Sequence, residues 1–242
     1  MSLKPCLALL LDGPMQSWGF ASRFTRRTTA LHPTKSGICG LLAAALGYDK
    51  HSADEPAQVA RLAALSCTTV TLPKKRGSGE LPMLRLSDYH TIGGGFDDVD
   101  WMKMPRSADG KTLKNAVISE RHYLLDARFG VLLEGEADFL TEIAAALENP
   151  RWGLWLGRKC CIPASPLCVG VFPSVADALK SLLNRSKLDE TLTLEHFDHV
   201  LENPAESEKD AEWLTDSPVA FGAEIGQRHA PRRILQKRRS MT

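Results

Sequence analysis

The stretch from Gly13 to Gly37, GPMQSWGFASRFTRRTTALHPTKSG, combines basic and aromatic side chains and contains no acidic residue. Guanidinium groups bind phosphates and stack on bases, and aromatic rings accept unstacked bases. This mixture is typical of proteins that bind single-stranded RNA. Two alternatives stay open, since the tryptophan could anchor the loop by packing and some arginines could pair with acids elsewhere. The residues concerned are Trp18, Arg23, Arg26, Arg27 and Lys35.

The end of this stretch is expected to start a helix, which runs from Lys35 to Leu46 and stops at Gly47. Thr34 and Ser36 are the candidate N-cap residues, directly after a proline. The free amide groups and the dipole at a helix N-terminus favour an anion. We therefore expect this helix start to face a phosphate, unless Thr34 or Ser36 acts only as a cap.

A second basic region lies between Pro73 and Glu120, where the chain is polar and rich in glycine. A connection this long inside a compact domain is usually functional or disordered. An aromatic ring and a histidine beside a series of cations favour RNA contact over a solvated loop. These residues are Lys74, Lys75, Arg76, Arg85, Tyr89, His90, Lys103, Arg106, Lys111, Lys114 and Arg121. The acidic residues Asp97, Asp98 and Asp100 indicate a tip that avoids phosphate or meets a basic protein neighbour.

A third candidate segment is LWLGRKC, from Leu154 to Cys160, at the predicted turn into the last strand of the fold. Gly157 permits a close approach of the backbone, and Arg158 and Lys159 could hold a phosphate. The alternative is an ordinary turn with solvated charges.

Other chemistries have weaker support in the sequence. His90 beside several lysines could act as the general base of a metal-independent ribonuclease, but no spacing fixes a second proton-transfer group. His196 and His199 have HxxH spacing but lack a third ligand or an HExxH pattern, so we expect no metal site. There is no Walker loop, Rossmann fingerprint or nucleophile elbow. We expect no catalytic residue and no cofactor.

The composition indicates a globular protein without a membrane segment. The net charge is +1, so any basic surface must be local. The six cysteines form no CxxC pair and lie mostly in apolar runs, which is typical of reduced, buried thiols. No apolar run is long enough to cross a bilayer, and the N-terminus carries no apolar signal region. We therefore expect a cytoplasmic location.

The order of predicted elements is β-α-β, a long excursion, then β-α-β. The strands are expected at 6–11, 65–72 and 121–134, a final strand or hairpin at 160–172, and the helices at 35–46 and 137–147. This order predicts an α+β fold, a ferredoxin-like or RRM-like plait (βαββαβ) with one antiparallel sheet backed by two helices. The excursion, about 74–120, is expected to form a β-hairpin thumb between the second and third strands. The plait would occupy residues 1–173.

Residues 174–242 are predicted to form a helix over 175–184 followed by a charged extension. An acidic block from Glu195 to Asp216 precedes a basic block from Arg228 to Arg239. Blocks of like charge are usually solvated or mobile tails.

Five stretches carry a resemblance to a known family. They are GPMQSWG (13–19), PTKSGICGLLAAALG (33–47), RLSDYHT (85–91), HYLLDARFGV (122–131) and PRWGLWLGRKCCIPASPL (150–167). In this order they resemble the CasD subunits of Cascade, the type I-E CRISPR surveillance complex, within the RAMP group of RNA-binding Cas proteins. The residues after Asn184 and those between Ile92 and Ser119 match no pattern of that family.

The resemblance implies an RRM-like fold with a thumb and a non-catalytic subunit that grips the 5′ handle of the crRNA. It also implies contact with a Cascade backbone subunit and the large PAM-reading subunit, and with target DNA only through the complex. The related subunit of type I-C systems is an endoribonuclease that processes precursor crRNA, which is the alternative function. Carried over by position, the handle-binding residues are Met15, Gln16, Trp18, Lys35, Ser36, Arg85, Tyr89, His90, Arg158 and Lys159.

Overall fold

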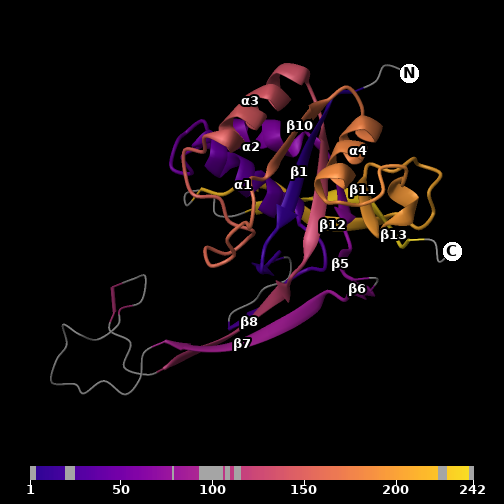
Figure 1. The fold of residues 1–242 in the computed structure, drawn as a ribbon. Helices are drawn as coiled ribbons and strands as arrows, with labels where there is room; N and C mark the ends of the chain where they lie inside the picture. The colour runs from indigo at the N-terminus through magenta and orange to yellow at the C-terminus, as the bar shows by residue number, and fades with distance from the viewer. Residues whose placement is uncertain are drawn as a thin grey trace.

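The structure is a computed structural model that describes residues 4–19, 25–77, 79–92, 106, 110–111, 116–222 and 228–239. Three predicted RNA-binding residues, Arg23, Lys103 and Lys114, and the predicted acidic tip lie outside these ranges. None of the helices in the described ranges is long and apolar enough to span a membrane. The chain has a mixed α+β architecture with antiparallel pairing in its largest sheet, as predicted (Figure 1).

The largest sheet contains seven strands in the order β10-β1-β9-β4-β11-β13-β12. Its first four members are β1 (Cys6–Asp12), β4 (Ser66–Thr71), β9 (Arg128–Glu134) and β10 (Cys168–Phe172). β1 lies between β9 and β10 and is antiparallel to both, and β9 also pairs antiparallel with β4. The spatial order β10-β1-β9-β4 agrees with the plait predicted from two βαβ halves.

Both faces of this sheet are covered, which explains the continuous apolar run in β1. Leu7, Leu9 and Leu11 pack with α1 (Lys35–Leu46), α2 (Glu55–Ala63) and α3 (Ala137–Glu148) in one core cluster. Cys6, Ala8 and Leu10 point to the other face and pack with α4 (Val175–Arg185) in a second cluster. The second layer arises because α4 lies against β1, β9 and β10 (Figure 1).

The helix α1 has the predicted limits. The Thr34 hydroxyl accepts a hydrogen bond from the Gly37 amide at 3.3 Å, so Thr34 is the N-cap. Gly47 ends the helix with φ 75°, and its amide donates to the Ala43 carbonyl. The choice of N-cap that the sequence left open therefore falls on Thr34.

The residues after α4 do not form a tail, and that prediction is wrong. A 3₁₀ turn, η1 (Leu194–His196), leads to β11 (His199–Glu202), β12 (Glu212–Ala220) and β13 (Arg228–Lys237). β11 pairs with β4 and β13 pairs with β11 and β12, so the acidic and basic blocks extend the sheet. Opposite charges from the two blocks meet in the interior, where Asp216 and Arg232 are 2% and 6% exposed.

The predicted excursion contains two hairpins. The smaller one pairs β5 (Lys74–Arg76) with β6 (Gly79–Leu81). The larger pairs β7 (Leu84–Ile92) with β8 (Val117–Leu125) and projects from the body as the predicted thumb (Figure 1). Its base is joined to the first loop, because β2 (Met15–Gln16) pairs antiparallel and β3 (Arg26–Arg27) pairs parallel with β8.

Two predicted strands have different limits in the structure. The segment 121–134 is split between β8 and β9 by a turn at Asp126, whose φ is 51°. In the segment 160–172, strand pairing begins only at Cys168, and the preceding residues form turns.

Candidate RNA-binding site

A hollow of about 260 Å³ brings together two of the segments that the sequence singled out, the stretch 13–37 and the turn within 154–160. The first loop, the start of α1 and the turn before β10 each contribute one wall. Its lining residues are Ser17, Trp18, Gly19, Arg27, Thr34, Ser36, Gly37, Gly157 and Arg158. Glycines, hydroxyls and two arginines make it suited to a phosphate or a sugar edge, and we refer to it as the loop hollow.

Glycines let the three segments approach one another closely. Gly157 has φ +98°, and a Cβ atom there would lie 1.8 Å from the Ser17 carbonyl oxygen. A Cβ atom on Gly37 would lie 2.8 Å from the Trp18 ring. The Ser17 amide also donates to the Leu156 carbonyl at 3.0 Å, which fixes the first loop against the turn. The predicted close approach of the backbone at Gly157 is therefore present, with Ser17 as the neighbour.

The first loop is held by buried side chains. Trp18 is 1% exposed, and its indole N–H donates to the Gln16 side-chain oxygen at 3.1 Å. The Gln16 amide nitrogen in turn donates to the carbonyls of Leu11 and Ala127 at 3.0 and 2.8 Å. Base stacking on the Trp18 ring and RNA contact by the Gln16 amide are contradicted by this burial. Trp18 takes the alternative role of a packed anchor, and Met15 is half-buried against the same core.

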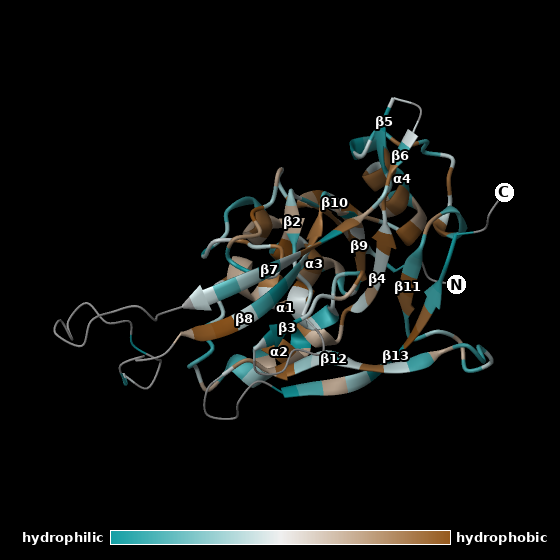
Figure 2. Cartoon of the chain, turned by 90° about the horizontal axis from the view of Figure 1, so that it is seen from below, coloured by the Kyte–Doolittle hydropathy of each residue, from teal (hydrophilic) through white to brown (hydrophobic). Residues whose placement is uncertain are grey.

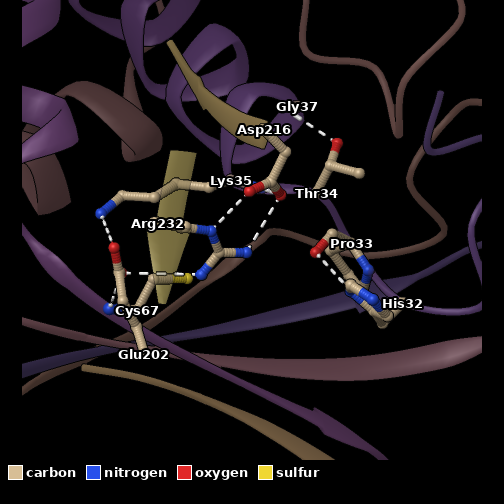
Figure 3. A network of polar contacts seen from close by, with 9 residues as sticks. All are labelled: His32, Pro33, Thr34, Lys35, Gly37, Cys67, Glu202, Asp216 and Arg232. Carbon is tan, nitrogen blue, oxygen red and sulfur yellow. Dashed lines mark hydrogen bonds and ion pairs between the residues drawn. The ribbon is translucent and has the colours of Figure 1, made fainter. Parts of the chain in front are cut away.

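Lys35 is also buried, which contradicts its predicted contact with RNA. It is 3% exposed, and its ammonium group forms an ion pair with Glu202 of β11. Glu202 further accepts a hydrogen bond from the Cys67 amide at 2.9 Å and lies 3.7 Å from the Arg232 guanidinium. Arg232 binds Asp216 through two hydrogen bonds of 2.5 and 3.0 Å. Figure 3 shows the network of two cations and two carboxylates.

The network also occupies the N-terminus of α1, and here the expected phosphate is replaced by a side chain. The amide of Lys35 donates to the Asp216 carboxylate at 2.8 Å (Figure 3). The positive end of the helix therefore already faces an anion, which comes from β12. The prediction that the start of α1 faces a phosphate is wrong at its first amide.

The groups that still face the loop hollow are fewer than predicted. Arg27 is exposed and its side chain has no hydrogen bond or ion pair within the described ranges. Ser36 is half-buried and lines the hollow, whereas Lys159 is exposed and is not part of the lining. Arg26 forms an exposed ion pair with Glu120 at 3.7 Å. Arg27 is therefore the cation best placed to receive a phosphate.

The predicted residues of the thumb lie on two faces. In the β7–β8 register, Arg85 and Tyr89 share one face, whereas His90 and Arg121 lie on the other. Tyr89 is 67% exposed, and Arg85 lines a separate, more apolar hollow of about 280 Å³ with Leu31 and Leu214. Lys111 is exposed beyond the paired strands. These residues therefore do not form one cluster with the loop hollow.

The histidines of the thumb have carboxylate neighbours of their own. The His122 ring lies 2.9 Å from Glu120, and the Ser87 hydroxyl donates to the same carboxylate at 2.9 Å. These hydrogen bonds lower the pKa of Glu120 below its usual value, and Arg26 adds to the effect. His90 lies 3.9 Å from Asp88. The described ranges hold no group of three or more side chains suited to a metal ion, and His196 and His199 lie in a 3₁₀ turn and a strand.

The sequence analysis missed Asp216, Glu202, Arg232 and Thr29 as residues that shape the site. The Thr29 hydroxyl accepts a hydrogen bond from the Trp18 amide at 2.8 Å. Charged residues at regular spacing in β12 and β13 could have indicated strands with a buried polar side, but their partners lie far away in sequence. The pair Lys35 and Asp216 is separated by 181 residues.

Comparison with known proteins identifies a family and a relative of this chain. The family described as CRISPR-associated protein (Cas_Cas5) matches residues 6–239. The CasD subunit of the CRISPR system Cascade from Escherichia coli (strain K12) is 32% identical over 190 residues, which is 75% of this chain and 77% of that protein.

Two solved structures resemble the whole fold. One is a chain of a CRISPR RNA-guided surveillance complex, with a TM-score of 0.68 and 30% identity over 96% of this chain and 89% of that one. The other is a crystal structure of a Cas protein, with a TM-score of 0.60 and 30% identity over 96% and 93% of the two chains. Because the family match spans nearly all described strands, the chain belongs to the CRISPR-associated Cas5 protein family.

Proposed function

We propose that this chain is a non-catalytic, RNA-binding subunit of a type I-E CRISPR surveillance complex, and that it holds the 5′ handle of the crRNA in the loop hollow. One observation carries the proposal. The basic stretch 13–37 and the turn at Gly157 and Arg158, more than one hundred residues away in sequence, surround one hollow that presents Arg27, hydroxyl groups and glycines. The similarity to CasD and to a chain of an RNA-guided surveillance complex supports the same role.

The chemistry of the hollow suits the sugar–phosphate chain of an RNA. Arginine forms charge-assisted hydrogen bonds with phosphate oxygens, and the Ser36 hydroxyl in the lining can donate a hydrogen bond to a phosphate or sugar oxygen. Tyr89, exposed on the thumb, offers a ring on which an unstacked base could lie. The protein would thus fix the handle by shape and charge, while sequence reading is left to the guide region of the RNA.

The test compares two arginines that differ in position but not in charge. Arg27→Ala removes the cation of the loop hollow, whereas Arg76→Ala removes an exposed cation from β5, outside the hollow. We expect Arg27→Ala to weaken binding of handle RNA about ten-fold or more and to reduce the salt dependence of binding. Fluorescence anisotropy with a labelled handle RNA measures both effects. Equal losses in the two variants would contradict the assignment of the site.

Contacts with other subunits are proposed for the thumb. Both of its strands carry exposed apolar side chains, including Leu84, Leu86, Val117 and Ile118, which are 56%, 38%, 44% and 43% exposed. Figure 2 shows hydrophobic colour at the outer end of the thumb strand β8, away from the body of the protein. Leu84, Leu86 and Val117 share one face of the hairpin in the strand register, and a backbone subunit that packs on this face would cover them. Leu84→Asp should reduce co-purification with the backbone subunit without changing the affinity for isolated handle RNA.

A non-catalytic role is supported by the placement of the thumb histidines. Ribonuclease chemistry without a metal needs an acid and a base on one phosphate. His90 and His122 occupy opposite faces of the hairpin, because His90 pairs with Ser119 in the strand register and His122 with Ser87. Repeat RNA incubated with the protein in EDTA should stay intact. Discrete cleavage that disappears in His90→Ala would replace this proposal with an endoribonuclease.

A further inference from the structure

Arg158 contacts three parts of the chain that meet at the base of the thumb. Its guanidinium donates to the His122 carbonyl of β8 at 3.2 Å and to the Arg27 carbonyl of β3 at 2.9 Å. Its central carbon lies 4.7 Å from the centre of the buried Tyr123 ring. The side chain starts in the turn before β10, so one group links this turn to β3 and to β8.

These contacts use the shape of the guanidinium more than its charge. Both hydrogen-bond acceptors are backbone carbonyls, and Arg158 forms no ion pair within the described ranges. A planar fork can donate to two carbonyls while its face lies on an aromatic ring. An ammonium group offers neither the fork nor the stacking surface.

Two of the elements that Arg158 links, β3 and β8, have little pairing with each other. β3 is two residues long, and it pairs with β8 only through Arg26 with Glu120 and Arg27 with Arg121. The Glu120 amide adds one bond to the Thr25 carbonyl at 2.9 Å. So few ladder bonds would leave the position of Arg27 poorly fixed without an additional contact.

We propose that Arg158 is a positioning residue, which holds β3 and β8 against the turn so that Arg27 faces the loop hollow. This inference rests on the proposed function for its effect on RNA, but not for its effect on the free protein. It assigns to Arg158 a role different from the direct phosphate contact predicted from the sequence. The two roles predict different results for a double variant.

The test is a thermodynamic cycle with Arg27→Ala, Arg158→Ala and the double variant, measured as affinity for handle RNA. If Arg158 acts through Arg27, each single variant weakens binding about ten-fold, and the double variant is little weaker than Arg158→Ala. Two independent phosphate ligands would instead give additive effects, about one hundred-fold together, and that result would overturn the proposal. Arg61→Ala is the matched control for affinity, since it removes an exposed arginine of α2 that does not line the loop hollow.

Amide hydrogen exchange of the RNA-free protein gives a second readout. Arg158→Ala should accelerate exchange of the Glu120 amide and of the other β3–β8 amides at least ten-fold, while β1 and β9 stay protected. Lys159→Ala should leave exchange unchanged. Arg158→Lys keeps the charge and should still accelerate exchange, which guards against loss of the fold in the alanine variant. Wild-type exchange in both Arg158 variants would overturn the proposal. If the wild-type protein fails to bind RNA, only the proposed function falls.

Discussion

The buried network around Lys35 gives a prediction whose size follows from the structure. The side chains of Lys35 and Glu202 are each 4% exposed, so neither charge is solvated. Glu202→Gln removes the partner of Lys35, while Arg232 keeps its two bonds to Asp216. Removing one member of a buried ion pair costs about 3–5 kcal/mol, because the other charge stays buried without compensation.

For a domain of this size, that loss lowers the melting temperature by about 6–20 °C. The double variant Lys35→Met/Glu202→Gln removes both charges and leaves the Arg232–Asp216 ion pair, whose net charge is zero. It should therefore recover about 2 kcal/mol relative to Glu202→Gln. Urea unfolding of the wild-type protein, Lys35→Met, Glu202→Gln and the double variant measures the coupling free energy between the two side chains directly.

An exposed ion pair provides the control. Arg61 and Glu142 are 3.7 Å apart, with side chains 56% and 51% exposed. Glu142→Gln should change the free energy of unfolding by no more than about 1 kcal/mol. The reasoning would be refuted if the double variant were no more stable than Glu202→Gln, or if Glu142→Gln cost as much as Glu202→Gln.

Three further predictions concern the loop hollow, the loop beside it and the thiols. Gly157→Ala should abolish handle-RNA binding, since its Cβ would overlap the Ser17 carbonyl. The control Gly77→Ala is also at positive φ, but a Cβ there would have no atom within 4 Å, so RNA binding should not be lost. Fluorescence anisotropy with labelled handle RNA measures the affinity of both variants. Burial lowers the pKa of His32 from 6.5, partly opposed by the Pro33 carbonyl. Below pH 6.5 the unfolded chain therefore binds more protons than the folded chain, so the free energy of unfolding decreases as the pH is lowered. Urea unfolding at pH 7 and pH 5 should show a smaller decrease for His32→Asn than for the wild-type protein, and an equal decrease would contradict this. At pH 8 iodoacetamide should label the exposed Cys160 first. Cys67 is buried, and burial raises its pKa to about 12, so it should react only after unfolding. Peptide mass mapping identifies the labelled cysteines.

Local patterns were sufficient to predict the elements that carry them within a few residues. The run CLALLL indicates a central strand, and the structure has β1 there, between two neighbouring strands and with helices packed on each face. α1 was predictable at both ends because Thr34 and Gly47 cap it locally: Thr34 accepts from the Gly37 amide, and the Gly47 amide donates to the Ala43 carbonyl. α2 was missed although Glu55 and Pro56 mark its start, because its short length gives few apolar repeats.

Other elements depend on contacts that no local pattern contains. β2 and β3 are two residues long and exist because β8 pairs with both of them. β12 and β13 look like solvated charge blocks in the sequence. Their buried charges are tolerated only because Asp216, Arg232, Glu202 and Lys35 neutralise one another in the interior.

The same long-range contacts changed the interpretation of the candidate site. The basic stretch without acids was read as a surface that awaits an external anion. Its lysine and the first amide of α1 are instead satisfied by Glu202 and Asp216, which come from the acidic block. A cation and a helix N-terminus therefore serve to hold the wall of the loop hollow, and the charge offered to RNA falls on Arg27. If so, replacing either acid should shift the wall and weaken RNA binding, although neither side chain lines the hollow.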